Sequence, residues 1–95
     1  MRVAFDVDGT LIKKSSTVGE DVPNYEVIAL MRFFAINTDA EIIVWSGSGV
    51  DYAKRWIEKI GIDHYVDRVV PKGDIAVDIT VDDQHVNVGL ANIKV

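Results

Sequence analysis

The sequence predicts an α/β fold built on a parallel β-sheet, and the order of its apolar segments is the main reason. Short apolar runs alternate with stretches in which apolar residues recur every three to four positions. The runs are typical of buried parallel strands, and the spaced stretches are typical of the helices that connect them. A length of 95 residues, with 48% hydrophobic and 26% charged residues, supports one folded domain over residues 1–95.

The first part of the chain contains one expected strand, one flap and one helix. Val3–Val7 is a short apolar run that ends at the turn signal Gly9-Thr10, as expected for a buried strand. Residues 9–22 are polar and mixed, so a loop or a small flap is expected there. A helix is predicted from Pro23, which suits a first helical turn, to about Ile36.

A second helix and further strands are expected in the rest of the chain. Ile42–Trp45 is an apolar run closed by Ser46-Gly47, with Trp45 in the core. From Val50 to Ile60 apolar residues follow a helical period, and Gly61 suits the end of that helix. The remaining expected elements are strands at 66–70 and 75–81 and, within 84–95, one helical turn and a last short strand around Ile93.

Composition and charge exclude several classes of protein. The chain has no cysteine, which excludes a disulfide scaffold, a cysteine nucleophile and a thiolate zinc site. A net charge of -5 argues against nonspecific nucleic-acid binding, so nucleic acid is expected only as a possible substrate. No apolar stretch approaches the roughly 20 residues of a membrane span. The N-terminal residues do not resemble a secretory signal, and a cytoplasmic location is expected.

Polar side chains gather where the expected strands end. The carboxyl ends of parallel strands meet at one edge of an open sheet, where ligands bind, so these side chains predict one composite site. Clustered carboxylates repel one another unless a cation is present, and oxygen ligands without cysteine suit Mg²⁺. Such a site, with a lysine, a hydroxyl and free amides at Gly47, would hold a phosphoryl group. The residues are Asp6 and Asp8 after the first strand, Ser46 after the second, Lys72 past the third, and Asp82 and Asp83 after the fourth.

These residues carry a resemblance to the haloacid dehalogenase-like (HAD) hydrolase superfamily. Asp6-Val7-Asp8-Gly9-Thr10-Leu11 matches its first motif, D-x-D-G-T-L, and Val44-Trp45-Ser46-Gly47 resembles the second. Lys72 resembles the third-motif lysine, and Val81-Asp82-Asp83 resembles the fourth motif. The four motifs stand in order across nearly the whole chain. The resemblance implies a Rossmann-like three-layer α/β sandwich with a central parallel sheet.

The resemblance also implies a Mg²⁺-dependent phosphatase that acts on a phosphomonoester through an aspartyl-phosphate. Asp6 would be the nucleophile, and Asp8 would protonate the leaving oxygen and then activate water. Because the two lie two residues apart on a strand, their side chains are expected on one face. Ser46, Gly47 and Lys72 would bind the substrate phosphate. The metal ligands would be the Asp6 side chain, the Asp8 backbone carbonyl, Asp82 and, directly or through water, Asp83.

No cap domain is expected, because neither of the segments where HAD enzymes carry one is long enough to fold separately. The flap after the first motif has about fourteen residues, and the gap from Gly47 to Pro71 is filled by one helix and one strand. The alternative function is a phosphate-binding or regulatory module that has lost turnover. Receiver domains also combine acids with a lysine, but here only Asp67 lies near the third strand, where their phosphorylated aspartate belongs.

Several of these residues also have a simpler interpretation that involves no function. Ser46 could cap the helix that follows it, and Lys13 or Lys14 could substitute for Lys72. Asp78 shares a strand face with Asp82, and a structural role near the sheet edge is expected for it. No site role is expected for the remaining acids and histidines singled out here, Asp51, Asp63, Asp67, Asp74, His64 and His85, although His85 follows the acidic pair closely.

The first helix is apolar over more than one face, which predicts a homodimer. Its sheet-facing side would hold Val27, Leu30, Met31 and Phe34, and this leaves part of Ile28, Phe33 and Ile36 pointing elsewhere. A small domain with an exposed apolar patch tends to cover it with a partner. The alternative is that the C-terminal segment folds over the helix and covers the patch within one chain.

Overall fold

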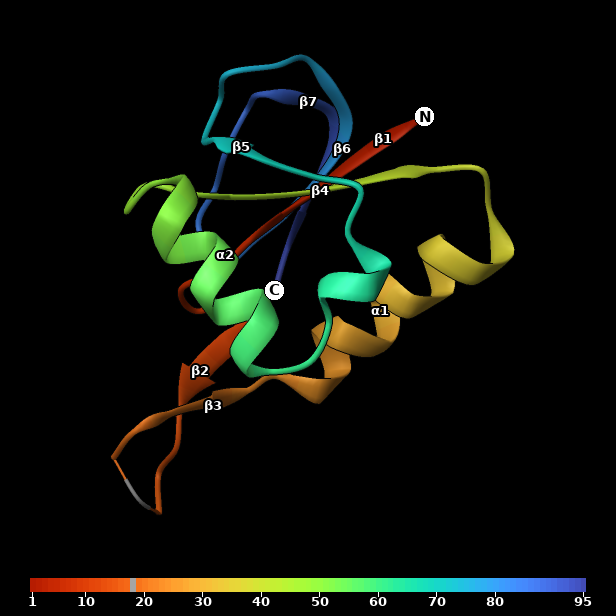
Figure 1. Cartoon of the computed structure of the whole chain (residues 1–95). Helices are drawn as coiled ribbons and strands as arrows, with labels where there is room; N and C mark the ends of the chain where they lie inside the picture. Colours follow the sequence, from red (N-terminus) through yellow and green to blue (C-terminus); the bar gives the residue numbers. More distant parts are fainter. Residues whose placement is uncertain (18) are drawn as a thin grey trace.

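The computed structural model describes residues 1–17 and 19–95, and its centre is a five-stranded parallel sheet (Figure 1). The strand order is β5-β4-β1-β6-β7, so the first strand lies in the middle. Every neighbouring pair in this sheet is parallel. The strands are β1 (Arg2–Asp6), β4 (Glu41–Ser46), β5 (Arg68–Pro71), β6 (Val77–Asp82) and β7 (Gly89–Lys94).

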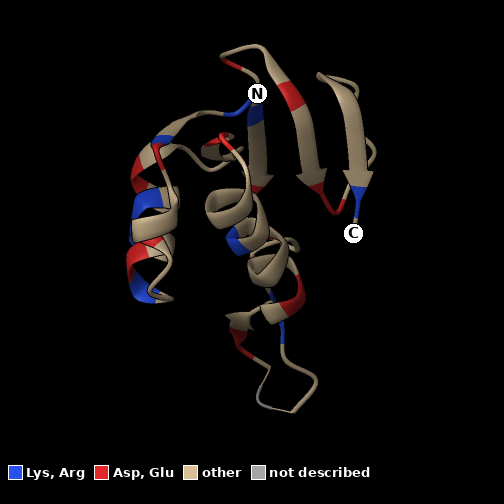
Figure 2. Cartoon of the chain, turned by 90° about the vertical axis from the view of Figure 1, so that its right-hand side faces the viewer, with Lys and Arg blue, Asp and Glu red and all other residues tan. Residues whose placement is uncertain are grey.

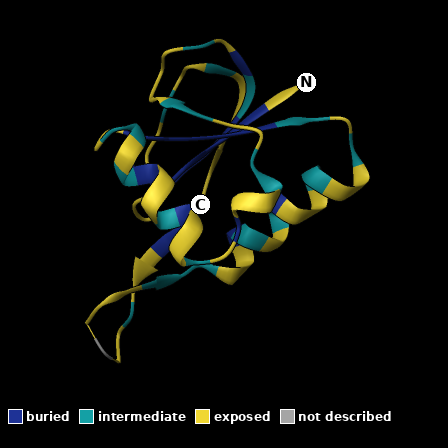
Figure 3. Ribbon diagram, viewed as in Figure 1, coloured by how far each residue is buried: buried dark blue, intermediate teal, exposed yellow. Residues whose placement is uncertain are grey.

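Two helices cover one face of this sheet, α1 (Tyr25–Asn37) and α2 (Val50–Lys59). Val27 and Met31 of α1, and Ala53 and Ile57 of α2, belong to one buried cluster together with Phe5 of β1. Figure 1 shows both helices on the same side of the strands, and Figure 3 shows the buried residues between the two layers. The α/β prediction is thus confirmed. No helix of the described residues is long and apolar enough to cross a membrane.

The opposite face of the sheet has a much thinner cover. Ala4, Ile43 and Trp45 form a second buried cluster there, and Ile75 from the β5–β6 connection packs against it. This connection lies across the sheet from the helices (Figure 1). Among the described residues the only other helical segment is the 3₁₀ turn η1 (Asp63–Tyr65). The expected three-layer sandwich is therefore not confirmed, because the described part of the chain places no helix on this second face.

Several expected boundaries were wrong. Pro23 ends β3 (Asp21–Pro23), which pairs antiparallel with β2 (Ile12–Lys14), so the expected flap is a short hairpin. The helix begins at Tyr25, after Pro23 has paired with Ile12 across the hairpin. The tail contains no helical turn. Instead, β7 is a full six-residue strand, because the free edge of β6 offers its backbone groups a partner.

The α1 side chains divide almost as the helical spacing predicts. Val27 and Met31 are buried, and Leu30 and Phe34 pack partly against the core. Ile28, one of the three off-face residues, also packs there. The other two off-face residues are exposed, Phe33 by 53% and Ile36 by 61%. The C-terminal segment forms β7 beside β6 and leaves both exposed, so the alternative that it covers them within one chain was wrong.

The homodimer stays a prediction, and Phe33 is the residue that tests it. We expect the chain to sediment as a dimer at micromolar concentration and Phe33→Glu to sediment as a monomer, because a charge opposes burial of the patch. Lys54→Glu, on the exposed side of α2, is the control and should leave the dimer unchanged. A monomeric wild-type chain contradicts the prediction, and a dimer that survives Phe33→Glu places the interface elsewhere.

Candidate functional site

The sheet topology brings two strand ends together where ligands usually bind. In chain order the five sheet strands are arranged 3-2-1-4-5, so the connections run to opposite sides of β1 and the order reverses between β1 and β6. Asp6 is the last residue of β1, and Asp82 is the last residue of β6. Figure 2 shows acidic residues at both strand tips, with the β2–β3 hairpin projecting beyond them. Asp6 and Asp82, two of the polar residues expected to converge, therefore lie where the strand order reverses between β1 and β6.

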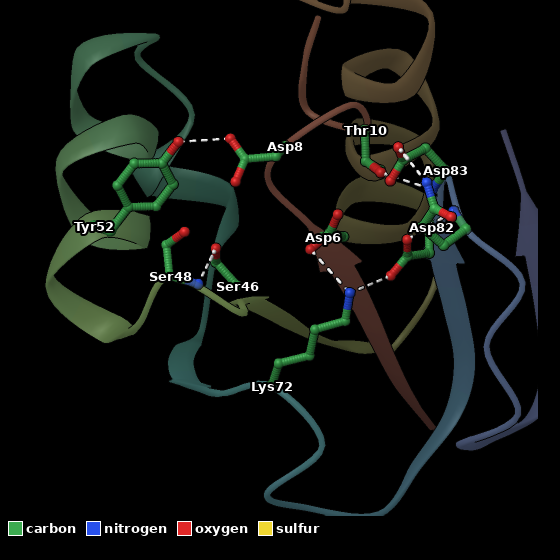
Figure 4. Close-up of polar contacts among 10 residues, drawn as sticks. Asp6, Asp8, Thr10, Ser46, Ser48, Tyr52, Lys72, Asp82 and Asp83 are labelled. Carbon is green, nitrogen blue, oxygen red and sulfur yellow. Dashed lines mark hydrogen bonds and ion pairs between the residues drawn. The ribbon is translucent and has the colours of Figure 1, made fainter.

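Lys72 lies between these two carboxylates (Figure 4). Its Nζ is 2.7 Å from Asp82 Oδ2 and 3.3 Å from Asp6 Oδ1. Lys72 follows the end of β5, the edge strand on the far side of β4, so its long side chain reaches across a strand to the site. Lys13 and Lys14, the two alternatives, lie on the exposed hairpin, and within the described part of the chain neither forms an ion pair.

The surroundings of Asp6 and Lys72 shift the pKa of both groups. Burial, and then the negative charge of Asp82, raise the pKa of Asp6 to about 6, although Lys72 opposes the shift. Burial alone lowers the pKa of Lys72, but the neighbouring Asp82 and Asp6 carboxylates outweigh it and raise the pKa above its usual value. Lys72 therefore stays charged at neutral pH. A single ammonium does not fully offset the cost of two buried carboxylates, and the site favours a further cation.

Asp83 completes a group of three carboxylates that could hold a metal ion. Asp6, Asp82 and Asp83 each offer one oxygen, and these oxygens lie within 4.8 Å of one another. Asp82 Oδ1 accepts a hydrogen bond from the backbone amide of Gln84 at 2.9 Å. Asp82 Oδ2 is buried, and no described donor meets it at a hydrogen-bonding angle, although the Lys72 ammonium is close. An all-oxygen donor set with a spare buried lone pair fits a hard divalent cation.

Gly9 and Thr10 place the loop after β1 in close contact with Asp83, just after the end of β6. Thr10 is buried, and its Oγ1 accepts a hydrogen bond from the Asp83 amide at 3.0 Å. Gly9 has a φ of +74°, and a Cβ atom placed there would overlap the Asp83 carboxylate. Any other residue at position 9 would be strained and would also displace Asp83. The two segments that carry the acids therefore depend on each other's positions.

Ser46 and Gly47 occupy the end of β4 as expected. Ser46 is buried, and its Oγ accepts a hydrogen bond from the Ser48 amide at 3.0 Å, which leaves its own proton free to donate. It is not the N-cap of α2, as the simpler interpretation suggested, because that position belongs to Gly49. Gly47 is exposed and has no side chain to block its amide. Both groups can donate to an anion near Asp6.

Asp8 takes a different direction from the one expected. β1 ends at Asp6, and Asp8 lies in the following turn, so strand alternation no longer governs its side chain. Tyr52, in the first turn of α2, donates its hydroxyl to Asp8 Oδ1 at 2.5 Å. This hydrogen bond, followed by partial burial, raises the pKa of Tyr52. Figure 4 shows Asp8 extending toward Tyr52 and away from Asp82 and Asp83.

Two of the remaining acids, Asp78 and Asp67, have structural roles away from the site. Asp78 Oδ2 accepts a hydrogen bond from the Arg2 amide at 2.7 Å, at the opposite end of the sheet. Its strand, β6, is not at the sheet edge. Asp67 Oδ2 accepts a hydrogen bond from the Ile42 amide at 2.7 Å and lies just before β5 begins. Because the acidic cluster lies at the other end of the strands, Asp67 cannot serve as the acceptor of a receiver-like site.

Sequence reasoning missed two residues that shape the site. Thr10 stood inside the first motif, but only as a turn signal, because its contact with Asp83 joins positions 73 residues apart. Tyr52 carried no signal at all, since its hydroxyl meets Asp8 across 44 residues. Comparisons of the chain with family models, curated proteins and solved structures gave no match. Any functional assignment therefore depends on the motifs and on this geometry.

Lys72→Met should destabilise the metal-free protein in a pH-dependent way. The loss should be about 2–3 kcal/mol at pH 7.5, less than for a fully buried pair because the Lys72 side chain is 29% exposed. In the wild type, the stability from Asp6 is full below pH 3.8 and is lost as the pH rises through about 6. Without Lys72 the pKa of Asp6 rises further, so more stability is lost between pH 5 and pH 7.5. At pH 5, where Asp6 is largely protonated in both proteins, the effect of the substitution should be smaller.

Urea unfolding in the presence of a chelator, followed by tryptophan fluorescence, measures the effect of Lys72→Met. Lys13→Met removes an equal charge from the exposed hairpin and should change the free energy of unfolding by less than about 0.5 kcal/mol. A loss for Lys72→Met that was equal at pH 5 and pH 7.5 would show that the lysine does not compensate Asp6.

Proposed function

We propose that this chain is a small, capless, Mg²⁺-dependent phosphatase of the HAD-like hydrolase superfamily that hydrolyses a phosphomonoester. The observation that carries the proposal is the position of Lys72, 3.3 Å from Asp6 and 2.7 Å from Asp82. Lys72 brings the first, third and fourth motifs together at one point, and Ser46 of the second motif lies at the end of the neighbouring strand β4. The side chains come from strands far apart in sequence, so their meeting is not a consequence of local structure.

In the proposed reaction Asp6 is the nucleophile. One of its carboxylate oxygens attacks the phosphorus, and the bond between phosphorus and the leaving oxygen breaks as the aspartyl-phosphate forms. The leaving oxygen keeps the electron pair of the broken bond and takes a proton from Asp8. Asp8, now a carboxylate, accepts a proton from water as the water attacks phosphorus. As the bond from water to phosphorus forms, the bond between phosphorus and the Asp6 oxygen breaks and Asp6 keeps its electron pair. This second step releases phosphate, leaves Asp6 as a carboxylate and Asp8 protonated, and so restores both aspartates.

The groups around Asp6 are suited to hold the phosphoryl group. The Ser46 hydroxyl and the Gly47 amide are free to donate to phosphate oxygens, and Lys72 places a charged ammonium beside the nucleophile. These donors are fixed before substrate arrives, since Ser46 is buried and its oxygen is already tied to the Ser48 amide. Preorganised donors of this kind stabilise charge in a transition state without having to reorient.

Asp6, Asp82 and Asp83 would hold Mg²⁺, together with the backbone carbonyl of Asp8. The grouping of three carboxylate oxygens and the spare lone pair of Asp82 support this ligand set. When bound, Mg²⁺ supplies positive charge that reduces the repulsion between an anionic nucleophile and an anionic phosphate. It would also offset the charge of Asp82, which adds to burial in raising the pKa of Asp6.

The exposed edge of the site supports the proposal that the protein has no cap domain. Asp8, Gly47 and Ser48 are exposed, and the described segments after the first and second motifs contain only the β2–β3 hairpin and the elements from α2 to β5. A large phosphorylated substrate can reach such an edge. The Rossmann-like three-layer sandwich also belongs to this proposal: the strand order supports it, and the face that carries Trp45 is where a third layer would pack.

Asp6→Asn should abolish hydrolysis of p-nitrophenyl phosphate in the presence of Mg²⁺. An amide cannot form the acyl-phosphate, so turnover should fall to background, a loss of at least about 10³-fold. The control is Asp39→Asn, which removes an exposed carboxylate in the turn before β4 and should keep full activity. Mass spectrometry excludes deamidation of the variant back to aspartate. Activity in pure Asp6→Asn protein rules out the covalent step. If the wild-type protein is inactive but binds phosphate, the result supports the alternative function, a phosphate-binding or regulatory module that has lost turnover.

Mg²⁺ should raise the melting temperature of the wild-type protein. A free Mg²⁺ concentration ten times the Kd adds about 1.4 kcal/mol, which corresponds to several degrees in a domain of this size. Asp82→Asn should lose most of this shift, while Asp39→Asn should retain it. Thermal unfolding with and without Mg²⁺ gives the shift, and calorimetry gives the Kd. Absence of binding at millimolar Mg²⁺ would remove the metal from the proposal.

A further inference from the structure

Tyr52 makes the one hydrogen bond to the Asp8 carboxylate within residues 1–17 and 19–95. The phenol donates to Oδ1 at 2.5 Å, and Oδ2 has no protein partner among those residues. Without this bond Asp8 would be an exposed side chain in a turn, free to adopt several rotamers. Figure 4 shows the two side chains directed at each other across the gap between the β1 loop and α2.

The helix gives Tyr52 a fixed position. Its neighbour Ala53 is fully buried, and the Ala53 amide is bonded to Gly49 at the start of the helix. Tyr52 itself is half-buried, so its ring has limited freedom. A side chain held on a packed helix can orient another more accurately than a loop residue can. The same helix follows directly on Ser46 and Gly47, the groups proposed to bind phosphate.

The chemistry of the contact distinguishes the two oxygens of Asp8. A phenol is protonated at neutral pH, so Tyr52 acts as the donor and Oδ1 as the acceptor. In a protonated carboxyl group the carbonyl oxygen is the better acceptor, and the hydroxyl oxygen carries the proton. A donor fixed on Oδ1 therefore favours the proton on Oδ2. The oxygen without a protein partner is the one available to a leaving group or to water.

We propose that Tyr52 is a positioning residue for proton transfer by Asp8. It holds the carboxyl group by Oδ1, so that Oδ2 gives its proton to the leaving oxygen and later takes one from the attacking water. This inference rests on the proposed phosphatase function, and it adds a residue that none of the four motifs contains. Tyr52 does not touch the substrate in this role.

Leaving groups of different basicity test the proposal. Ethyl phosphate has a strongly basic leaving oxygen that needs a proton, whereas p-nitrophenolate departs almost unaided. Tyr52→Phe removes only the hydroxyl. We expect kcat/KM for ethyl phosphate to fall by about 10-fold or more, a part of the 10²–10⁴-fold contribution of general acid catalysis. For p-nitrophenyl phosphate, kcat/KM should change by less than about 3-fold, since this parameter reports the step up to formation of the phospho-enzyme.

Tyr25→Phe is the matched control, because Tyr25 is 74% exposed and begins α1 rather than α2. It should leave kcat/KM for both substrates unchanged. Circular dichroism and thermal unfolding should show that Tyr52→Phe folds, since the lost hydrogen bond is exposed and the ring is kept. A general structural defect would lower both kcat/KM values by the same factor.

The outcomes separate this inference from the function on which it rests. A selective loss on ethyl phosphate supports the positioning role. An equal loss on both substrates, or no loss on either, overturns that role and leaves the phosphatase in place. A wild-type protein that hydrolyses neither substrate with Mg²⁺ overturns the proposed function itself, and the role of Tyr52 with it.

Discussion

Two carboxylates buried side by side are the constraint on which the rest of this structure depends. Asp6 is 5% exposed and Asp82 is 1% exposed, at the ends of adjacent strands. Removing such charges from water costs several kcal/mol each unless an opposite charge is near. Lys72 supplies that charge from the far edge of the sheet. The strand order therefore has an electrostatic consequence, because it places the ends of β1 and β6 side by side and Lys72 reaches both acids from the end of β5.

The loops around the acids are built to keep them in place. Gly9 has the positive φ that the turn needs and leaves room for Asp83, while Thr10 binds the Asp83 amide. On the other side, α2 presents Tyr52 to Asp8 and follows directly from Ser46. Contacts from the end of β6 and from the first turn of α2 therefore hold the loop after β1 on both sides. Preorganisation of this kind is what phosphoryl transfer needs, because its catalysis consists mainly of positioning and charge stabilisation.

The sheet that carries the site is well covered on only one of its two faces. Helices cover one face, and a short connection with Ile75 covers the part of the other face that holds Trp45. β7 lies at the edge of the sheet, and most of its residues are exposed. The best buried residues are those of β1 and β4, whereas β7 is mostly exposed although its end pairs with Asp82. Burial is concentrated where the proposed chemistry needs fixed groups.

The sequence by itself determined the α/β class, the main strands, and the polar residues that end them. Those features depend on local patterns: apolar runs, helical spacing and the D-x-D-G-T-L motif. Only the tertiary structure decided that Lys72 and not Lys13 meets the acids, that Asp8 turns toward Tyr52, and that the tail strand extends over six residues. Each of these outcomes joins groups on separate elements. A one-dimensional pattern records which groups are present, but their pairing follows from packing, strand order and the free backbone edge of a neighbouring strand.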